Sequence, residues 1–363
     1  MKENEPPPNL PFGSGHEIVE EREKMKLPAV EVKNSVVFAN PAFKEGAPFD
    51  VVLGKPTKLG VFFTPEPGAH EGERVMEPKL LPEGKTRSGL MGSAIFRDRD
   101  GNLWRDVDAK GIGLVSGTVE NVYNISDKPD ELKAKGLVDY NYAIGDSQMA
   151  EKLLKAGIRT YRVIGITLLE EIVIKRGEDG TVKKIPIKEA EERGMIPKGM
   201  QPVAEIRAFG TKERIYSVYS SSSGKERAEA ALKDAKLLVA QELGIDPEKF
   251  STPEYLEWFA KTLGKEVAKL HKLKLFHNYL SNHNISLDCR IVDLDSVDKA
   301  NSDRSYFEDT DYAGTSLLEL VEGIGDNTTE GNELQSKEYY KRLFNDSYEA
   351  ELALKKRGAR QEK

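Results

Sequence analysis

The chain has 363 residues, enough for one large domain or two moderate ones with a buried core. Its formal net charge of −7 argues against general nucleic-acid binding, because that function requires a basic surface. The sequence has a single cysteine, no run of about 18 apolar residues to span a membrane, and no signal-peptide pattern at its start. We therefore expect a cytoplasmic protein without internal disulfides, and neither nucleic acid nor membrane among its partners.

The first part of the chain carries strand patterns. Residues 1–26 are rich in Pro, Glu and Gly, which predicts a flexible segment. Short β-branched or alternating runs separated by turns then predict strands over residues 29–32, 35–38, 59–63, 93–97, 103–110, 160–169 and 171–175, with an extended pattern over 203–218. One helix is predicted over residues 146–156, ended by Gly157. Residues 27–218 are thus expected to form a β-rich lobe.

The pattern becomes helical after the serine run at residues 220–223, which is typical of a hinge. Residues 226–243 are rich in Ala and Leu and stop at Gly244, a frequent helix C-cap. Ser251 and Glu254 form a capping box that predicts the start of a second, amphipathic helix. A third helix is predicted over residues 336–357. Residues 219–363 are therefore expected to form a helical lobe, which makes the chain an α+β protein.

The segment from residue 284 to residue 295 contains candidate metal ligands. Residues 285–287 and 290–292 are predicted as short strands joined by a two-residue turn at residues 288–289. In that register Asn284 lies directly opposite Asp293, with Cβ atoms about 5 Å apart. An amide oxygen and a carboxylate are hard ligands that suit Mg²⁺ or Mn²⁺ together with phosphate oxygens. Asp295 points to the same face and is a further candidate.

The same segment resembles a known family of folds. His277, followed after six residues by Asn284 and then by Asp293, resembles the catalytic loop and metal-binding aspartate of protein kinases. Tyr279 stands where conventional kinases carry the catalytic aspartate, and a phenol does not replace that base near neutral pH. The chain most resembles the selenoprotein O type of protein AMPylase, which also lacks this aspartate. The resemblance implies a two-lobed, protein-kinase-like fold with a β-rich N-lobe and a helical C-lobe.

Further short segments extend the resemblance across residues 105–300. Residues 108–113 resemble the segment that supplies the nucleotide-binding lysine, which is Lys110 here. Residues 150–165 resemble the helix and strand that follow it. The partner of Lys110 is expected from the predicted helix, and the sequence leaves Asp146 and Glu151 open. These acids lie five residues apart, about 140° around a helix, so only one of them faces Lys110.

Other residues have alternative roles that the sequence leaves open. Arg207 and Arg214 are seven residues apart, as are two phosphate-binding arginines of the resembled family. Ordinary ion pairs with nearby glutamates are the alternative. His283 stands where that family carries its proposed base, and a structural histidine is the alternative. His277 is expected to buttress the loop.

The resemblance implies an ATP- and Mg²⁺-dependent protein adenylyltransferase that acts on Ser, Thr or Tyr hydroxyls of a protein acceptor. In that reaction Lys110, Arg207 and Arg214 neutralise phosphates, Asn284 and Asp293 hold the metal, and His283 assists the hydroxyl. Two alternatives remain open. The first is a pseudokinase that binds a partner with or without nucleotide, and the second is a phosphotransferase that uses another carboxylate, such as Asp295.

Overall fold

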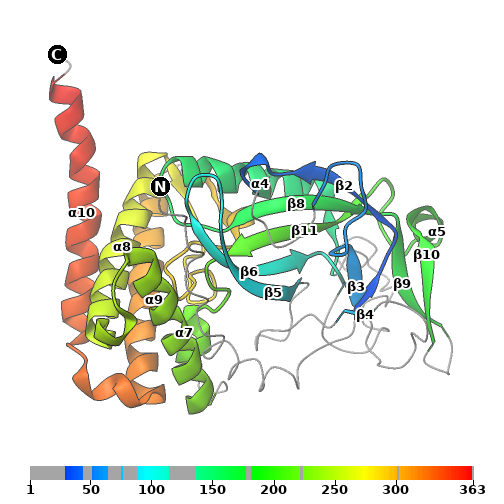
Figure 1. Ribbon diagram of the computed structural model, residues 1–363. Helices are drawn as coiled ribbons and strands as arrows, with labels where there is room; N and C mark the ends of the chain where they lie inside the picture. Colours follow the sequence, from blue (N-terminus) through cyan, green and yellow to red (C-terminus); the bar gives the residue numbers. More distant parts are fainter. Residues whose placement is uncertain are drawn as a thin grey trace, which may run out of the picture. The chain divides into compact units, whose positions relative to one another are not determined.

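The computed structural model describes residues 29–43, 51–63, 75–76, 88–113, 136–176, 181–220, 224–300 and 302–361, so the predicted flexible segment 1–26 lies outside the described residues. The protein is a mixed α+β structure, as the sequence predicts (Figure 1). It divides into two compact units. The sheet unit runs to Ser147 and resumes from Arg162 to Phe209, and the helical unit comprises Gln148–Tyr161 and the chain from Gly210 onward.

The sheet unit is built on a six-stranded antiparallel sheet. In spatial order its strands are β2 (Asn34–Ala39), β8 (Arg162–Leu169), β11 (Pro202–Phe209), β6 (Leu103–Lys110) and β5 (Ser88–Arg97), with β7 (Val138–Asp139) beside β11. The predicted hairpin of β5 and β6 is confirmed. Asp98 stabilises the turn of this hairpin. Its carboxylate accepts hydrogen bonds from the backbone amides of Asp100 and Asn102 and from the Trp104 indole.

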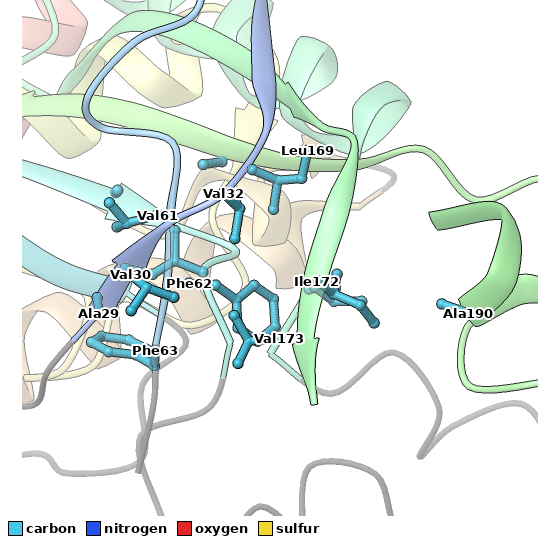
Figure 2. Close-up of a cluster of buried hydrophobic side chains, with 14 of the residues drawn as sticks. Ala29, Val30, Val32, Val61, Phe62, Phe63, Leu169, Ile172, Val173 and Ala190 are labelled. Atoms are coloured by element: carbon cyan, nitrogen blue, oxygen red, sulfur yellow. The ribbon is translucent and has the colours of Figure 1, made fainter. Parts of the chain in front are cut away.

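Smaller elements complete the sheet unit. Strands β1 (Ala29–Glu31), β3 (Val61–Phe63) and β4 (Val75–Met76) form one small sheet, and β9 (Glu171–Arg176) and β10 (Thr181–Pro186) form another, followed by helix α5 (Ile187–Glu192). Their apolar side chains meet in one buried cluster, in which Phe62 and Phe63 lie near Ile172 and Val173 (Figure 2). Burial of apolar surface stabilises this end of the unit by about 25 cal/mol per Å².

The helical unit consists mainly of long helices (Figure 1). They are α7 (Lys225–Leu243), α8 (Thr252–Lys272), α9 (Asp303–Asn327) and α10 (Lys337–Gln361), with a short α6 (Ile215–Tyr219) before them. Helix α8 packs along α10. The approach is close, since a Cβ at Gly264 would lie 2.3 Å from the carbonyl oxygen of Phe344. None of the helices in the described ranges is both long and apolar enough to cross a membrane.

Local sequence signals explain where these helices begin and end. Ser251 and Glu254 form the predicted capping box, with the Ser251 amide 2.8 Å from the Glu254 carboxylate. Gly244 ends α7 in the left-handed conformation, with a φ of 68°. The predicted apolar face of α8 is fully buried at Leu256, Phe259 and Leu263.

Two predicted boundaries are wrong. Helix α4 covers Tyr140–Lys155, so it begins six residues before the predicted start at residue 146. The extended pattern over 203–218 holds only to Phe209, and Ile215–Tyr219 forms helix α6 instead. The hydroxyl of Ser217 hydrogen-bonds the Arg214 amide and the Glu213 carboxylate, which favours a helical turn over a strand.

Candidate functional site

The alternation of side chains along β6 and β11 gives the main sheet a charged face. Asp108 and Lys110 of β6 lie on the same side as Glu205 and Arg207 of β11, because Lys110 pairs with Glu205 and Asp108 with Arg207. Residues between them, such as Ala109, point to the apolar core. All four side chains of the charged face are buried, with exposed fractions between 0% and 5%. Buried charges of this kind require partners or a ligand.

Lys110 of the charged face has a charged and an aromatic neighbour but no hydrogen bond to any described residue. Its Nζ lies 3.9 Å from Asp146 Oδ2 of helix α4 and 5.1 Å from the ring centre of Tyr142. The ammonium makes no hydrogen bond to any residue that the structure describes. Of the two acids that the sequence leaves open, Asp146 therefore faces Lys110 within the sheet unit. Gly111 follows with a φ of 94°, so the strand ends directly after the lysine.

Glu205 is a member of the charged face that holds its proton to a higher pH than an ordinary glutamate. Burial and the neighbouring Asp146 carboxylate raise the pKa of Glu205 well above its usual range. Protonation of Glu205 removes a negative charge from beside the Asp146 carboxylate. The charged face then balances two cations, Lys110 and Arg207, against the carboxylates of Asp108 and Asp146.

The raised pKa of Glu205 predicts a pH-dependent stability. The folded protein keeps the proton above pH 4.5, where the unfolded chain loses it, so the stabilisation is complete at low pH and is lost as pH rises through the folded pKa. Glu205→Gln removes this titration. As pH rises from about 5 to about 8, we expect the free energy of unfolding of the variant to increase relative to that of the wild type. The increase is up to about 1.4 kcal/mol per pH unit. Urea unfolding at several pH values measures the difference.

Glu192→Gln, at an exposed glutamate of the same unit, serves as control and should show the same pH dependence of stability as the wild type. Parallel curves for Glu205→Gln and wild type would contradict the assignment.

The two arginines occupy different surroundings. Arg207 donates from Nε and Nη2 to the two carboxylate oxygens of Asp108, at 2.9 and 2.7 Å, in a buried bidentate pair. Arg214 belongs to the helical unit, is half-buried, and donates through Nη1 to the backbone carbonyl of His283. Both guanidinium groups thus have protein partners, and the partner of Arg207 is a buried aspartate of β6 rather than one of the nearby glutamates.

In the helical unit, the segment between α8 and α9 has an unusual backbone. Four residues other than glycine have a positive φ: Lys274 at 58°, Asn278 at 76°, Cys289 at 56° and Asp293 at 67°. Such conformations cost of order 1 kcal/mol or more and persist only where surrounding contacts impose them. Lys274 precedes residues 277–284, here called the 277–284 loop, and Asn278 lies within it. Cys289 and Asp293 belong to the predicted metal hairpin. Strain of this kind concentrates at functional sites.

The predicted register of the metal hairpin is wrong by one residue. Ile285 pairs with Ile291, and the Ser286 amide donates to the Arg290 carbonyl at 3.0 Å. The turn therefore has three residues, Leu287–Cys289, because Cys289 takes the left-handed conformation that such turns require. The Val292 amide donates to the Asn284 carbonyl at 2.9 Å, so Val292 rather than Asp293 lies opposite Asn284.

Asp293 directly follows Val292, the residue that lies opposite Asn284 in this hairpin. The Asn284 Nδ2 donates to the Tyr279 carbonyl at 2.8 Å, which fixes the amide and leaves its Oδ1 as an acceptor. Asp293 is half-buried and starts the short 3-10 helix Leu294–Ser296. In the described ranges no three His, Cys, Asp or Glu side chains group to hold a metal ion. An amide and one carboxylate form a smaller set, of the kind that suits a partly hydrated Mg²⁺.

The two histidines of the loop differ in surroundings. His277 is fully buried, and its Nε2 lies 2.7 Å from the Val292 carbonyl while its Nδ1 faces the Tyr279 amide at 3.4 Å. Burial lowers the pKa of His277, so the neutral ring donates from Nε2 and braces the hairpin. His283 is exposed, and its ring stacks on Tyr216 with centres 4.2 Å apart.

Asp309 of helix α9 is the anchor of the loop. Its carboxylate, fully buried, accepts the His277 amide at 2.7 Å and the Asn278 amide at 3.0 Å. It also lies 3.3 Å from His271 Nε2. These bonds impose the positive φ of Asn278. The sequence analysis did not identify Asp309, because nothing local distinguishes it among 61 acidic residues.

No family model matches this sequence, and no curated protein matches it either. The resemblance to AMPylases therefore stays a prediction. Glu205 and Asp108, like Asp309, were missed as site residues. A signal for Glu205 was present, since Glu205 and Arg207 alternate with apolar residues in a strand that is otherwise buried.

Proposed function

We propose that this chain is an ATP- and Mg²⁺-dependent transferase of the two-lobed protein-kinase-like class, which transfers AMP to Ser, Thr or Tyr hydroxyls of a protein. The observation that carries this proposal is Lys110. A buried ammonium with no hydrogen bond, held 3.9 Å from the Asp146 carboxylate, is costly unless an anion joins it. Phosphate oxygens of a nucleotide provide the acceptors that Lys110 lacks.

The residues of the charged face would keep Lys110 in position. Asp146 fixes the ammonium as a point charge, and the neutral Glu205 prevents a surplus of negative charge that would repel phosphates. Arg207 is held by Asp108, so its role is electrostatic, as a positive charge on the same face, rather than a bidentate clamp.

Asn284 and Asp293 would hold the metal through Oδ1 and the carboxylate. Bound Mg²⁺ neutralises the charge that develops on the phosphates during transfer. The protein contributes a fixed amide, because Asn284 Nδ2 is bonded to the Tyr279 carbonyl, and a backbone braced by His277. Preorganised ligands of this kind lower the cost of reaching the transition state.

Transfer of AMP rather than phosphate is favoured by the residue at position 279. The Tyr279 side chain is 56% exposed and cannot serve as a base near neutral pH. We assign assistance of the acceptor hydroxyl to His283, whose exposed ring is oriented by its stacking on Tyr216. Tyrosine in place of the kinase aspartate also favours one alternative, a nucleotide-binding pseudokinase that transfers neither AMP nor phosphate.

A paired transfer assay tests the proposal. The protein is incubated with Mg²⁺ or Mn²⁺, cell lysate as acceptor, and ATP labelled at the α- or the γ-phosphate. We expect label from the α-position only, and a loss of at least about 100-fold in Asp293→Ala, since removing one preorganised charge contact has effects of this size. Asp298→Ala, at an exposed aspartate five residues later, should retain the transfer.

Each outcome assigns the protein differently. Label from the γ-position only would make the chain a kinase despite Tyr279. ATP binding without transfer in either channel would favour the pseudokinase. Equal α-transfer by Asp293→Ala and wild type would remove Asp293 from the metal site.

A further inference from the structure

A line of hydrogen bonds leads from the last long helix to the 277–284 loop. The Tyr348 hydroxyl of α10 lies 2.8 Å from His271 Nδ1 of α8, and His271 Nε2 lies 3.3 Å from Asp309 Oδ2 of α9. Asp309 in turn accepts the amides of His277 and Asn278. All of these residues belong to the helical unit. Helices α9 and α10, which lie later in the sequence, are therefore joined to α8 and the loop that follows it by successive polar contacts.

The chemistry of the groups gives this line a direction. The Asp309 carboxylate only accepts hydrogen bonds, so His271 must donate to it from Nε2. In the neutral ring Nδ1 is then an acceptor, and the Tyr348 hydroxyl donates to it. Burial raises the pKa of Tyr348, so the phenol keeps the proton that it donates. Tyr348 thereby stabilises the tautomer of His271 that donates to Asp309.

We propose that Tyr348 is a positioning residue for the 277–284 loop, which acts through His271 and Asp309 to hold the strained backbone next to Asn284. The loop contacts themselves do not depend on the proposed function, whereas an effect on metal and nucleotide binding rests on it. Asp309 has two carboxylate oxygens and three donors, and its orientation decides whether both loop amides are satisfied. Helix α10 therefore stabilises the conformation of the loop through Tyr348. A change at Tyr348 alters the backbone next to the candidate metal ligand Asn284.

Amide hydrogen exchange of the whole, nucleotide-free protein tests the proposal directly. In Tyr348→Phe we expect the His277 and Asn278 amides to exchange about five- to tenfold faster, the change expected for the loss of one hydrogen bond. Tyr339→Phe is the matched control. This tyrosine also lies on α10 and donates a hydrogen bond to Glu257, but it has no contact with the line. Its loop amides should exchange at the wild-type rate.

A second variant separates positioning from a general loss of packing. In His271→Gln the amide nitrogen can still donate to Asp309, but the ring nitrogen Nδ1 that contacts the Tyr348 hydroxyl is lost. We expect the same faster exchange at His277 and Asn278, and no further increase in the double variant with Tyr348→Phe. Additive effects, or unchanged exchange in Tyr348→Phe, would overturn the proposal.

A binding measurement distinguishes this inference from the proposed function. Mn²⁺ affinity is measured by electron paramagnetic resonance in the presence of ATP. We expect several-fold weaker binding in Tyr348→Phe and an unchanged affinity in Tyr339→Phe. If the wild type binds no Mn²⁺ under these conditions, the metal assignment fails, while the exchange data still decide the positioning role of Tyr348.

Discussion

Replacing Lys110 by methionine is expected to lower transfer from α-labelled ATP by roughly 100- to 1,000-fold, the range observed when a preorganised electrostatic contact is removed. Methionine preserves the apolar stem of the lysine, so packing in the sheet unit should be retained. The variant also leaves the buried Asp146 carboxylate without its charge partner at 3.9 Å, so some loss of stability is expected beside the loss of transfer. The transfer assay and thermal unfolding of the same preparations measure the two effects separately.

The matched control for this experiment is Lys188→Met in α5. The Lys188 side chain is 87% exposed and pairs only weakly with Glu192, at 4.0 Å. Transfer by this variant should equal that of the wild type. Full activity of Lys110→Met, with the fold intact, would exclude Lys110 from phosphate binding and would favour a purely structural charged face.

Replacing Asp309 by alanine is expected to destabilise the protein by about 3 to 5 kcal/mol. The variant leaves the buried amide of His277 and the partly buried amide of Asn278 without their acceptor, and a buried group of this kind costs about 1 to 3 kcal/mol. It also removes the carboxylate that pairs with His271. Urea unfolding measures the loss, and transfer activity should fall with it because the loop loses its anchor.

Asp311→Ala provides the comparison for this effect. Asp311 lies two residues further along α9 and is exposed, so its replacement should change stability by less than about 0.5 kcal/mol. Similar effects of the two substitutions would show that the loop is held by other contacts. A large loss at Asp309 alone identifies this carboxylate as the determinant of the loop backbone.

Local sequence signals predicted several elements well. The hairpin of β5 and β6 follows from an aspartate and glycine turn between strand patterns, and the start of α8 follows from its capping box. Such elements are specified by residues within a few positions of each other. The family resemblance also implied the pairing of Lys110 with an acid of the following helix, with Asp146 as one of two alternatives.

Other features required contacts between distant residues. Helix α9, which carries Asp309, was not predicted at all, because its buried face is interrupted by polar residues such as Ser305 and Ser316. The register of the metal hairpin was predicted with a two-residue turn, since Cys289 gives no local sign of a left-handed conformation. That conformation places the buried thiol near the Phe259 carbonyl of α8, at 3.7 Å.

The sequence by itself therefore determined the α+β class, most strands and long helices, and the chemical types of the candidate ligands. Composition, periodicity and capping residues suffice for these, because each acts over one or two turns or strands. Only the tertiary structure decided that Asp146 faces Lys110, that Glu205 lies beside them, and that Asp309 holds the loop. Burial and the proximity of charges from distant segments set these relationships, and no local pattern encodes them.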